Sequence, residues 1–506
     1  MKKGSRFALL TLALVMLLGT FAACKNDTPT PTPGNSTASN TNGEPSGEPG
    51  TDTEPAVETD ENGYVKDNIP ADVDYHDKEL NVLWWKLSAD RTVPDGDVSN
   101  SKDEVLKKSY YQMVELESRL NINLNVIREE GGWGAGATFM AKARNAGENG
   151  YDLICSYSLW PSALASEDLL VDLKKLSNPD LDKPWWPEST EEWSQYGKLF
   201  FVSSNSSLTA LQSMEVMFCN SKMFTDRSLE DPIDLALEGK WTVDRMLELV
   251  KEFEGDLAED DPSHVYGLTI DDFSRLDALV YGAGFTTTRN NSDGVAEMSF
   301  TNPSESQRLS DFIDKLIPVF KTSAVGIASN NTNWMREHKT ALMVASFEEL
   351  SKMSDNDYAP LPSPKLDESQ EKYAVIQNNG YDVWCVPASA QDPEISAVVI
   401  EAIASADYRG IAPFYFEKYM KLRYSADAKA GAMFELVRSS VTYNLGRMMV
   451  DTEGKFHDLG IRFRGCFWDN GVKTPNNKIL DGINRKGDLW KARLTELLQT
   501  YRNSTN

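Results

Sequence analysis

The sequence is poor in the residues that most often build metal centres and disulfide frameworks. Its 506 residues include only 4 histidines and 5 cysteines. The histidines are scattered and never stand beside cysteines at the spacing of metal ligands. Five cysteines are also too few for a disulfide-dense scaffold. We therefore expect no metal site, no cofactor and no histidine-based catalysis.

Positive charge is also scarce. Lys and Arg total 51 against 77 Asp and Glu, which gives a formal net charge of −26. Such an excess of negative charge repels phosphate backbones and anionic lipid headgroups, so we expect no nucleic-acid partner. The 41% hydrophobic content is typical of a soluble globular protein, and the length suggests roughly two to four domains of about 150 residues each.

Recognisable catalytic motifs are missing as well. The sequence has no nucleophile elbow, Walker motif or HExxH motif. Adjacent acids such as Glu129-Glu130 and Glu348-Glu349 point in different directions on a strand or helix, so they do not indicate an acid and base flanking a substrate. We expect a protein that is not an enzyme and has no catalytic residues, with a secreted two-carboxylate glycoside hydrolase as the alternative.

Long apolar runs are limited to the N-terminus. Basic residues precede an apolar run over residues 7–18, which is short for a transmembrane helix and typical of a signal peptide. The following Phe21-Ala22-Ala23-Cys24 resembles a bacterial lipobox, although Phe21 replaces the usual Leu-like residue. The resemblance implies a lipoprotein signal peptide over residues 1–23 and lipidation of Cys24. The alternative is ordinary signal-peptidase cleavage, with Cys24 a spare thiol.

Residues 24–62 have the composition of a tether. They are rich in Pro, Thr, Ser, Gly and Glu and offer almost nothing to bury, so ordering them would cost entropy without compensation. We expect this segment to be disordered. The lipidated Cys24 would hold the protein on the extracytoplasmic face of the cell membrane, with no segment crossing the bilayer.

The pattern becomes globular near residue 80 and alternates strands with helices. Residues 80–85 form a short apolar run, residues 121–127 alternate with period two, and residues 151–156 form a third strand pattern. Apolar residues at helical spacing fill the intervals over residues 105–120 and 139–146, and a short helix is predicted over 164–176. This alternation predicts an α/β fold with a parallel sheet.

Seven short segments, taken in order, resemble the bacterial extracellular solute-binding proteins, family 1, the maltose-binding-protein-like carbohydrate-binding lipoproteins of ABC transporters. In the family's "Pro-Asp-Val/Ile" strand Tyr151 replaces proline, and in its "Gly-Leu-Leu-x-Asp-Leu" segment Asp168 replaces glycine. The seven matching segments are residues 151–154, 168–173, 217–224, 240–246, 339–344, 359–364 and 391–397.

The resemblance implies a two-lobed, type II-like periplasmic-binding-protein fold. Each lobe would hold a mostly parallel sheet flanked by helices, and crossover hinge segments near residues 201–212 and 346–358 would join them. The implied N-terminal lobe comprises residues 63–205 and 350–408, and the C-terminal lobe comprises residues 206–349 and 409–506. The implied function is to bind a solute between the lobes and deliver it to ABC transporter permease subunits, and we expect a monomer.

Aromatic residues point to a carbohydrate, which we expect to be an oligosaccharide. The chain has 12 Trp, 18 Tyr and 20 Phe, and sugar rings pack their C–H faces on aromatic planes. Trp133 lies in a glycine-rich loop, and Phe347 stands where sugar-binding relatives carry a stacking Trp. Packing is the alternative role for any one ring. The candidate ligand-binding residues are Trp84, Trp85, Trp133, Tyr157, Trp160, Gln212, Trp334, Phe347, Asn379 and Tyr381.

Other ligands and roles stay open. A charged Arg/Asp pair in the cleft would favour a peptide, and a polyol is a further possibility for the same fold. A neighbouring sensor instead of a transporter would make the protein a signalling subunit. Cys155, Cys219 and Cys385 lie in apolar strand runs, which favours buried free thiols. A disulfide among these and Cys466 is the alternative.

Overall fold

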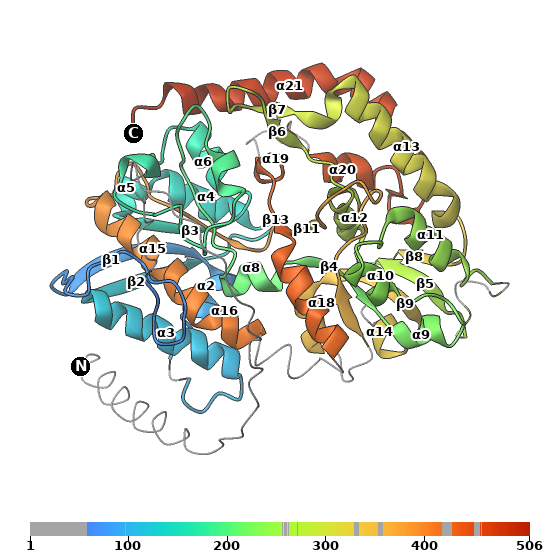
Figure 1. The fold of residues 1–506 in the computed structure, drawn as a ribbon. Helices are drawn as coiled ribbons and strands as arrows, with labels where there is room; N and C mark the ends of the chain where they lie inside the picture. Colours follow the sequence, from blue (N-terminus) through green and yellow to red (C-terminus); the bar gives the residue numbers. More distant parts are fainter. Residues whose placement is uncertain are drawn as a thin grey trace, which may run out of the picture. The chain divides into compact units, whose positions relative to one another are not determined.

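The computed structural model describes residues 58–506 except 97, 256, 258–260, 262, 271, 328–332, 353–357, 417–427, 450–455 and 457. The predicted signal peptide, Cys24 and most of the tether lie outside the described residues. The chain from Val57 onward forms one compact unit. Within it, two separate sheets mark two lobes, as the family resemblance implied (Figure 1).

The sheet of the first lobe has the strand order β12-β3-β1-β2. β1 pairs in parallel with β2 and β3, whereas β12 pairs antiparallel with β3. The strands begin and end close to the predicted positions. The elements of this part of the chain are β1 (Lys78–Trp85), α2 (Lys86–Thr92), α3 (Glu104–Leu120), β2 (Ile122–Glu129), α4 (Gly136–Arg144), α5 (Ala146–Asn149), β3 (Leu153–Tyr157), α6 (Pro161–Ser166), η1 (Leu173–Lys175) and α7 (Thr190–Trp193).

The sheet of the second lobe has the order β10-β4-β9-β5-β8. β5 pairs in parallel with β8 and β9, and β4 pairs antiparallel with β9 and β10. The elements are α8 (Leu208–Gln212), β4 (Glu215–Cys219), α9 (Ser221–Thr225), α10 (Pro232–Leu237), α11 (Val243–Lys251), β5 (Tyr266–Ile270), η2 (Phe273–Leu276), α12 (Asp277–Gly282), β6 (Thr288–Asn290), β7 (Ala296–Met298), η3 (Ser299–Thr301), α13 (Pro303–Phe320), β8 (Val325–Ile327), α14 (Asn333–Arg336), β9 (Thr340–Ser346), η4 (Phe347–Lys352) and β10 (Ala359–Leu361).

The return to the first lobe comes later in the chain than the predicted boundary at residue 350. β10 pairs with β4 inside the second sheet, with Pro360 opposite Phe218 at the sheet edge, where a proline is tolerated. The chain then passes through β11 (Val375–Ile376) and enters the first sheet at β12 (Asp382–Cys385). The pairing of an apolar edge strand with β4 is therefore what keeps residues 359–361 in the second lobe.

The C-terminal part of the chain contacts both lobes. α15 (Pro393–Arg409) packs on α3 of the first lobe, and α18 (Ala428–Ser439) packs on β10 of the second. The remaining elements are α16 (Ile411–Pro413), β13 (Val441–Thr442), α19 (Leu445–Met448), α20 (Leu459–Arg464), β14 (Trp468–Asp469), β15 (Val472–Lys473) and α21 (Ile479–Asn503). Trp490, Leu494 and Leu498 are buried and lie on one face of α21, because they are four residues apart. Among the described helices, none has both the length and the apolar character needed to span a membrane.

Candidate functional site

The carboxyl ends of the parallel strands in the first sheet meet at one edge. Trp85 at the end of β1 lies opposite Glu129 at the end of β2, and Tyr157 at the end of β3 lies opposite Asp382 at the start of β12. In open α/β sheets, ligands bind beside the carboxyl ends of the strands. We therefore take this edge as the first wall of the candidate site.

Three aromatic side chains line up at this edge. The rings of Trp85 and Tyr157 are 5.5 Å apart between centroids, and those of Tyr157 and Trp160 are 6.2 Å apart. Trp85 is nearly fully buried and its indole N–H donates to the carboxylate of Asp382 at 2.6 Å. Ser88 donates to the other carboxylate oxygen of Asp382 at 2.8 Å, so the group that accepts from the Trp85 indole is itself held in place.

A glycine-rich loop wraps these rings and carries the most exposed tryptophan. The indole N–H of Trp160 donates to the carbonyl of Gly131. A Cβ at Gly131 would lie 2.9 Å from Trp85, and one at Gly136 would lie 2.2 Å from the Trp160 ring, so both positions require glycine. Trp133, between them in sequence, is 75% exposed. The loop thus contacts two packed indoles and carries a third that is exposed.

Burial raises the pKa of Tyr157 to about 12, although the positive charges of Arg447 and Arg275 oppose the shift. Its hydroxyl is therefore neutral over the physiological range and can both donate and accept hydrogen bonds. Burial likewise raises the pKa of Asp382, against the donors Ser88 and Trp85. The hydroxyl of Ser162 on α6 donates to the carbonyl of Met448 at 2.7 Å, so α19, which carries Arg447, contacts the first lobe.

The second wall comes from the sheet of the second lobe and from α19. Glu215 at the start of β4 accepts a hydrogen bond from Arg275 of η2 at 2.8 Å. Arg447 of α19 donates to Asp277 at 2.5 Å and to the carbonyl of Gln377 at 3.1 Å. These contacts place two arginine–carboxylate pairs at the interface between the lobes.

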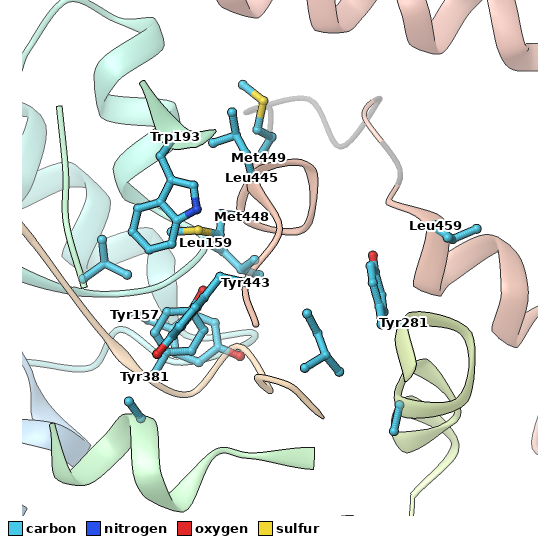
Figure 2. Close-up of a cluster of buried hydrophobic side chains, with 14 of the residues drawn as sticks. Tyr157, Leu159, Trp193, Tyr281, Tyr381, Tyr443, Leu445, Met448, Met449 and Leu459 are labelled. Carbon is cyan, nitrogen blue, oxygen red and sulfur yellow. The ribbon is translucent and has the colours of Figure 1, made fainter. Parts of the chain in front are cut away.

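Five of the ten predicted ligand residues share this region. They are Trp85, Tyr157, Trp160, Asn379 and Tyr381, with Trp133 on the adjoining loop. The carbonyl of Asn379 accepts from the Ser158 hydroxyl at 2.9 Å, which ties the last crossover to the end of β3. Tyr381 is buried against Tyr443, with ring centroids 5.3 Å apart. Figure 2 shows Tyr157, Tyr381 and Tyr443 close together, with Tyr281 of the second lobe set apart from them.

The other four predicted residues lie elsewhere, and their roles in the ligand site stay predictions. Trp84 is buried and packs edge-on against Trp384, because successive strand residues point to opposite faces. Trp334 packs on Tyr266, with centroids 4.9 Å apart. Phe347 is fully buried and stacks on Phe416. Gln212 accepts from Arg91 and lines a separate cavity of about 280 Å³.

Sequence reasoning missed an aromatic pair on the second lobe. Phe273, three residues after the end of β5, is 36% exposed and lies parallel to Trp468 of β14, with ring centroids 6.1 Å apart. The position of Phe273 after a strand was a usable signal. Trp468 had none, because nearly 200 residues of chain separate the two and only the fold brings them together.

The cysteines and acids of the described residues show no metal site and no disulfide. Cys155, Cys219, Cys385 and Cys466 are free and buried, and burial raises the pKa of each thiol. Within the described part of the chain, no group of three or more His, Cys, Asp or Glu residues could hold a metal ion.

The solved structures that resemble this chain share little sequence with it. A search of curated proteins found no match. Among solved structures, the chain is similar to the galacto-N-biose/lacto-N-biose I-binding protein from Bifidobacterium longum (10% identity, 85% of this chain and 97% of that one, TM-score 0.49). It is also similar to the cyclic α-maltosyl-1,6-maltose-binding protein from Arthrobacter globiformis (13% identity, 83% and 99%, TM-score 0.49).

The family assignment rests on a sequence model rather than on these distant structural likenesses. The model described as bacterial extracellular solute-binding protein matches residues 104–409, which is more than half of the chain. The matched segment runs from α3 to the end of α15 and includes every strand of the two sheets except β1. Trp85 of β1 and Arg447 of α19 lie outside it. The chain therefore belongs to the bacterial extracellular solute-binding protein family.

Proposed function

We propose that this protein captures a carbohydrate, expected to be an oligosaccharide, between its lobes and delivers it to the permease subunits of an ABC importer. One observation carries the choice of carbohydrate: an exposed tryptophan, Trp133, lies on the loop that contacts the ring row Trp85–Tyr157–Trp160. Apolar sugar faces pack on aromatic planes, and sugar hydroxyls need a few well-placed polar groups. Tyr157 supplies such a group because its hydroxyl stays neutral.

A peptide ligand is the second candidate, because arginine–carboxylate pairs do lie at the interface between the lobes. Arg275 bonds Glu215, and Arg447 bonds Asp277. In each pair the guanidinium already has a carboxylate partner, and Glu215 and Asp277 are almost fully buried. A charged peptide end would have to compete with these partners, whereas a neutral sugar would not. We therefore favour the carbohydrate.

Attachment and location complete the proposal. We infer that the chain is a monomer held by lipidated Cys24 on the extracytoplasmic face of the cell membrane, with the tether placing the binding lobes away from the bilayer. The measurement is the distribution of the protein between membranes and medium. A Cys24→Ser variant is expected to move to the medium, and retention of the variant in the membrane fraction would contradict lipid anchoring through this residue.

The ligand class is tested by a thermal-shift screen of the mature chain against oligosaccharides, peptides and polyols, followed by calorimetry. A ligand that binds only the folded state raises the melting temperature. We expect one family of oligosaccharides to do so without release of sugar products. A rise with peptides alone would favour the second candidate. Release of sugar products would instead indicate a glycoside hydrolase. An unchanged melting temperature with every sugar would exclude a carbohydrate ligand.

The site is tested by Trp133→Ala. Loss of a stacking indole is expected to weaken sugar binding by about 1–3 kcal/mol. The melting temperature of the free protein should barely change, because Trp133 is exposed. Leu489→Ala removes a comparably exposed apolar side chain from α21 and is the matched control, with wild-type affinity expected. Wild-type affinity in Trp133→Ala would remove this residue from the site.

A further inference from the structure

The last helix, α21, is long enough to reach from one lobe to the other. Its 25 residues span about 37 Å at 1.5 Å per residue. At its start, Asn477 donates to the carbonyl of Ser310 at 3.1 Å and to Asp314 at 3.0 Å, both on α13 of the second lobe. In Figure 1, α21 runs from α13 along the top of the molecule toward α6 of the first lobe.

The first half of α21 is packed firmly on the second lobe. Trp490 is buried against Phe300 with ring centroids 5.9 Å apart, and the Arg462 guanidinium lies 4.8 Å from its ring. Burial of an indole contributes a large apolar area, so this half of the helix is strongly held. The second lobe therefore carries α21 with it.

Two lysines of the first lobe bind the far end of α21 and the residues after it. Lys175 donates to the carbonyls of Thr505 at 2.8 Å and Asn506 at 2.7 Å. The ammonium of Lys198 donates to the carbonyls of Tyr501 at 2.9 Å, Arg502 at 3.0 Å and Ser504 at 2.5 Å. A lysine has three N–H donors, and all three are used here. The last carbonyls of a helix lack partners within the helix and carry partial negative charge, so a cation at this place is favourable.

Aromatic contacts complete the docking of this end. Tyr501 is fully buried and packs edge-on against Phe200, with centroids 5.0 Å apart. The segment that presents Lys198 and Phe200 is itself fixed in the first lobe, because the Leu199 amide donates to Asp172 and its carbonyl accepts from the Leu173 amide at 2.7 Å. The end of α21 is thus attached to the first lobe and its beginning to the second.

We propose that α21 is a strap that restricts rotation of the two lobes, with the Lys198–Tyr501 contact as its detachable end. Hinge rotation changes the distance between surfaces on the two lobes. A helix fixed to both surfaces must either stop that rotation or let one end go. Water can replace the hydrogen bonds at Lys198, whereas nothing replaces the packing of Trp490, so we take the far end as the one released. Tyr501 and the contact between α21 and α6 must separate with it. This regulation rests on the proposed function, in which solute capture moves the lobes.

The test measures lobe separation directly and needs no solute. Spin labels are placed on cysteines introduced at Glu115 of α3 and Lys251 of α11, which are exposed on the first and second lobes. The native cysteines 155, 219, 385 and 466 are buried. In the mature protein with Lys198→Met we expect a shifted or broader distance distribution by electron–electron double resonance. Lys174→Met, which removes an exposed pair with Glu191 on the same lobe, should leave the distribution unchanged.

Hydrogen exchange reports the state of the strap in the same samples. Amides of the last turn of α21 should exchange about tenfold faster or more in Lys198→Met, and faster still in Lys198→Met/Tyr501→Ala. Released amides with a wild-type distance distribution would overturn the proposal. Unchanged exchange in the double variant would also overturn it, because these two residues would then not hold the end. Neither result depends on the identity of the ligand. A failure of the strap proposal can therefore be told apart from a failure of the carbohydrate proposal.

Discussion

At the scale of single residues, a buried glutamate makes stability depend on pH. Glu401 of α15 is fully buried and accepts hydrogen bonds from the Asp180 amide at 3.1 Å and the Trp186 indole at 3.2 Å. Burial raises its pKa from 4.5 to about 7, although these donors oppose the shift. The folded state therefore binds a proton over a range of pH in which the unfolded chain has lost it.

The sign of the pH effect follows from this raised pKa. The stabilising contribution is fully present below about pH 4.5 and is lost as the pH rises through about 7. Glu401→Gln keeps an acceptor for both donors and removes the charge, so we expect it to stabilise the protein at pH 8 by an amount on the order of 3 kcal/mol. Urea denaturation between pH 5 and pH 8 measures this. Exposed Glu371→Gln is the control, and an unchanged pH slope in Glu401→Gln would contradict the assignment.

At the scale of elements, the N-terminus of α11 illustrates how a sequence signal determines a helix boundary. The hydroxyl of Thr242, the residue before the first turn of α11, accepts a hydrogen bond from the Arg245 amide at 3.4 Å. We expect Thr242→Ala to lower the free energy of unfolding by about 1 kcal/mol. Thr242→Ser keeps the cap oxygen and should recover most of that loss in chemical denaturation. If serine costs as much as alanine, the cap contributes little and the lost methyl packing is responsible.

At the scale of the whole molecule, buried ion pairs join the C-terminal segment to the second lobe. Asp277 is almost fully buried between Arg447, 2.5 Å away, and Arg464, 3.0 Å away. Arg447 also holds the crossover through the carbonyl of Gln377. Removing one partner of a buried pair leaves an uncompensated charge, which is strongly destabilising.

We therefore expect Arg447→Met to lower the free energy of unfolding by about 3–5 kcal/mol. The double variant Arg447→Met/Asp277→Asn should recover part of this loss, because it removes a buried carboxylate that has lost one of its two arginine partners. Lys222→Met breaks an exposed pair with Asp226 and should change stability by less than about 1 kcal/mol. Guanidinium denaturation measures all three. A cost for Arg447→Met as small as that of the exposed pair would show that the network contributes little.

Local sequence patterns predicted the first strands of the first lobe correctly. The prediction was wrong where the chain pairs with a segment that is distant in sequence. The apolar run and the period-two run gave β1 and β2 to within a few residues. The predicted helix over residues 164–176 instead stops at Ser166, and Asp168 takes a positive φ of 59°. Beyond it, the amide of Val171 donates to the carbonyl of Val386 at 2.9 Å. Pairing with a segment more than 200 residues away in sequence replaced the helical hydrogen bonds there.

For the candidate site, the sequence by itself determined the cluster whose members are close in the chain or follow strand ends. Trp85, Tyr157 and Trp160 belong to this group, because strand ends of a parallel sheet meet at one edge. Only the tertiary structure decided that Trp84 faces the opposite side, since the alternation along β1 does not show which face turns to the site. The same holds for Arg447, Phe273 with Trp468, and the Lys198 cap on α21. Their partners are separated by long stretches of chain, and such contacts leave no periodic or local trace in a sequence.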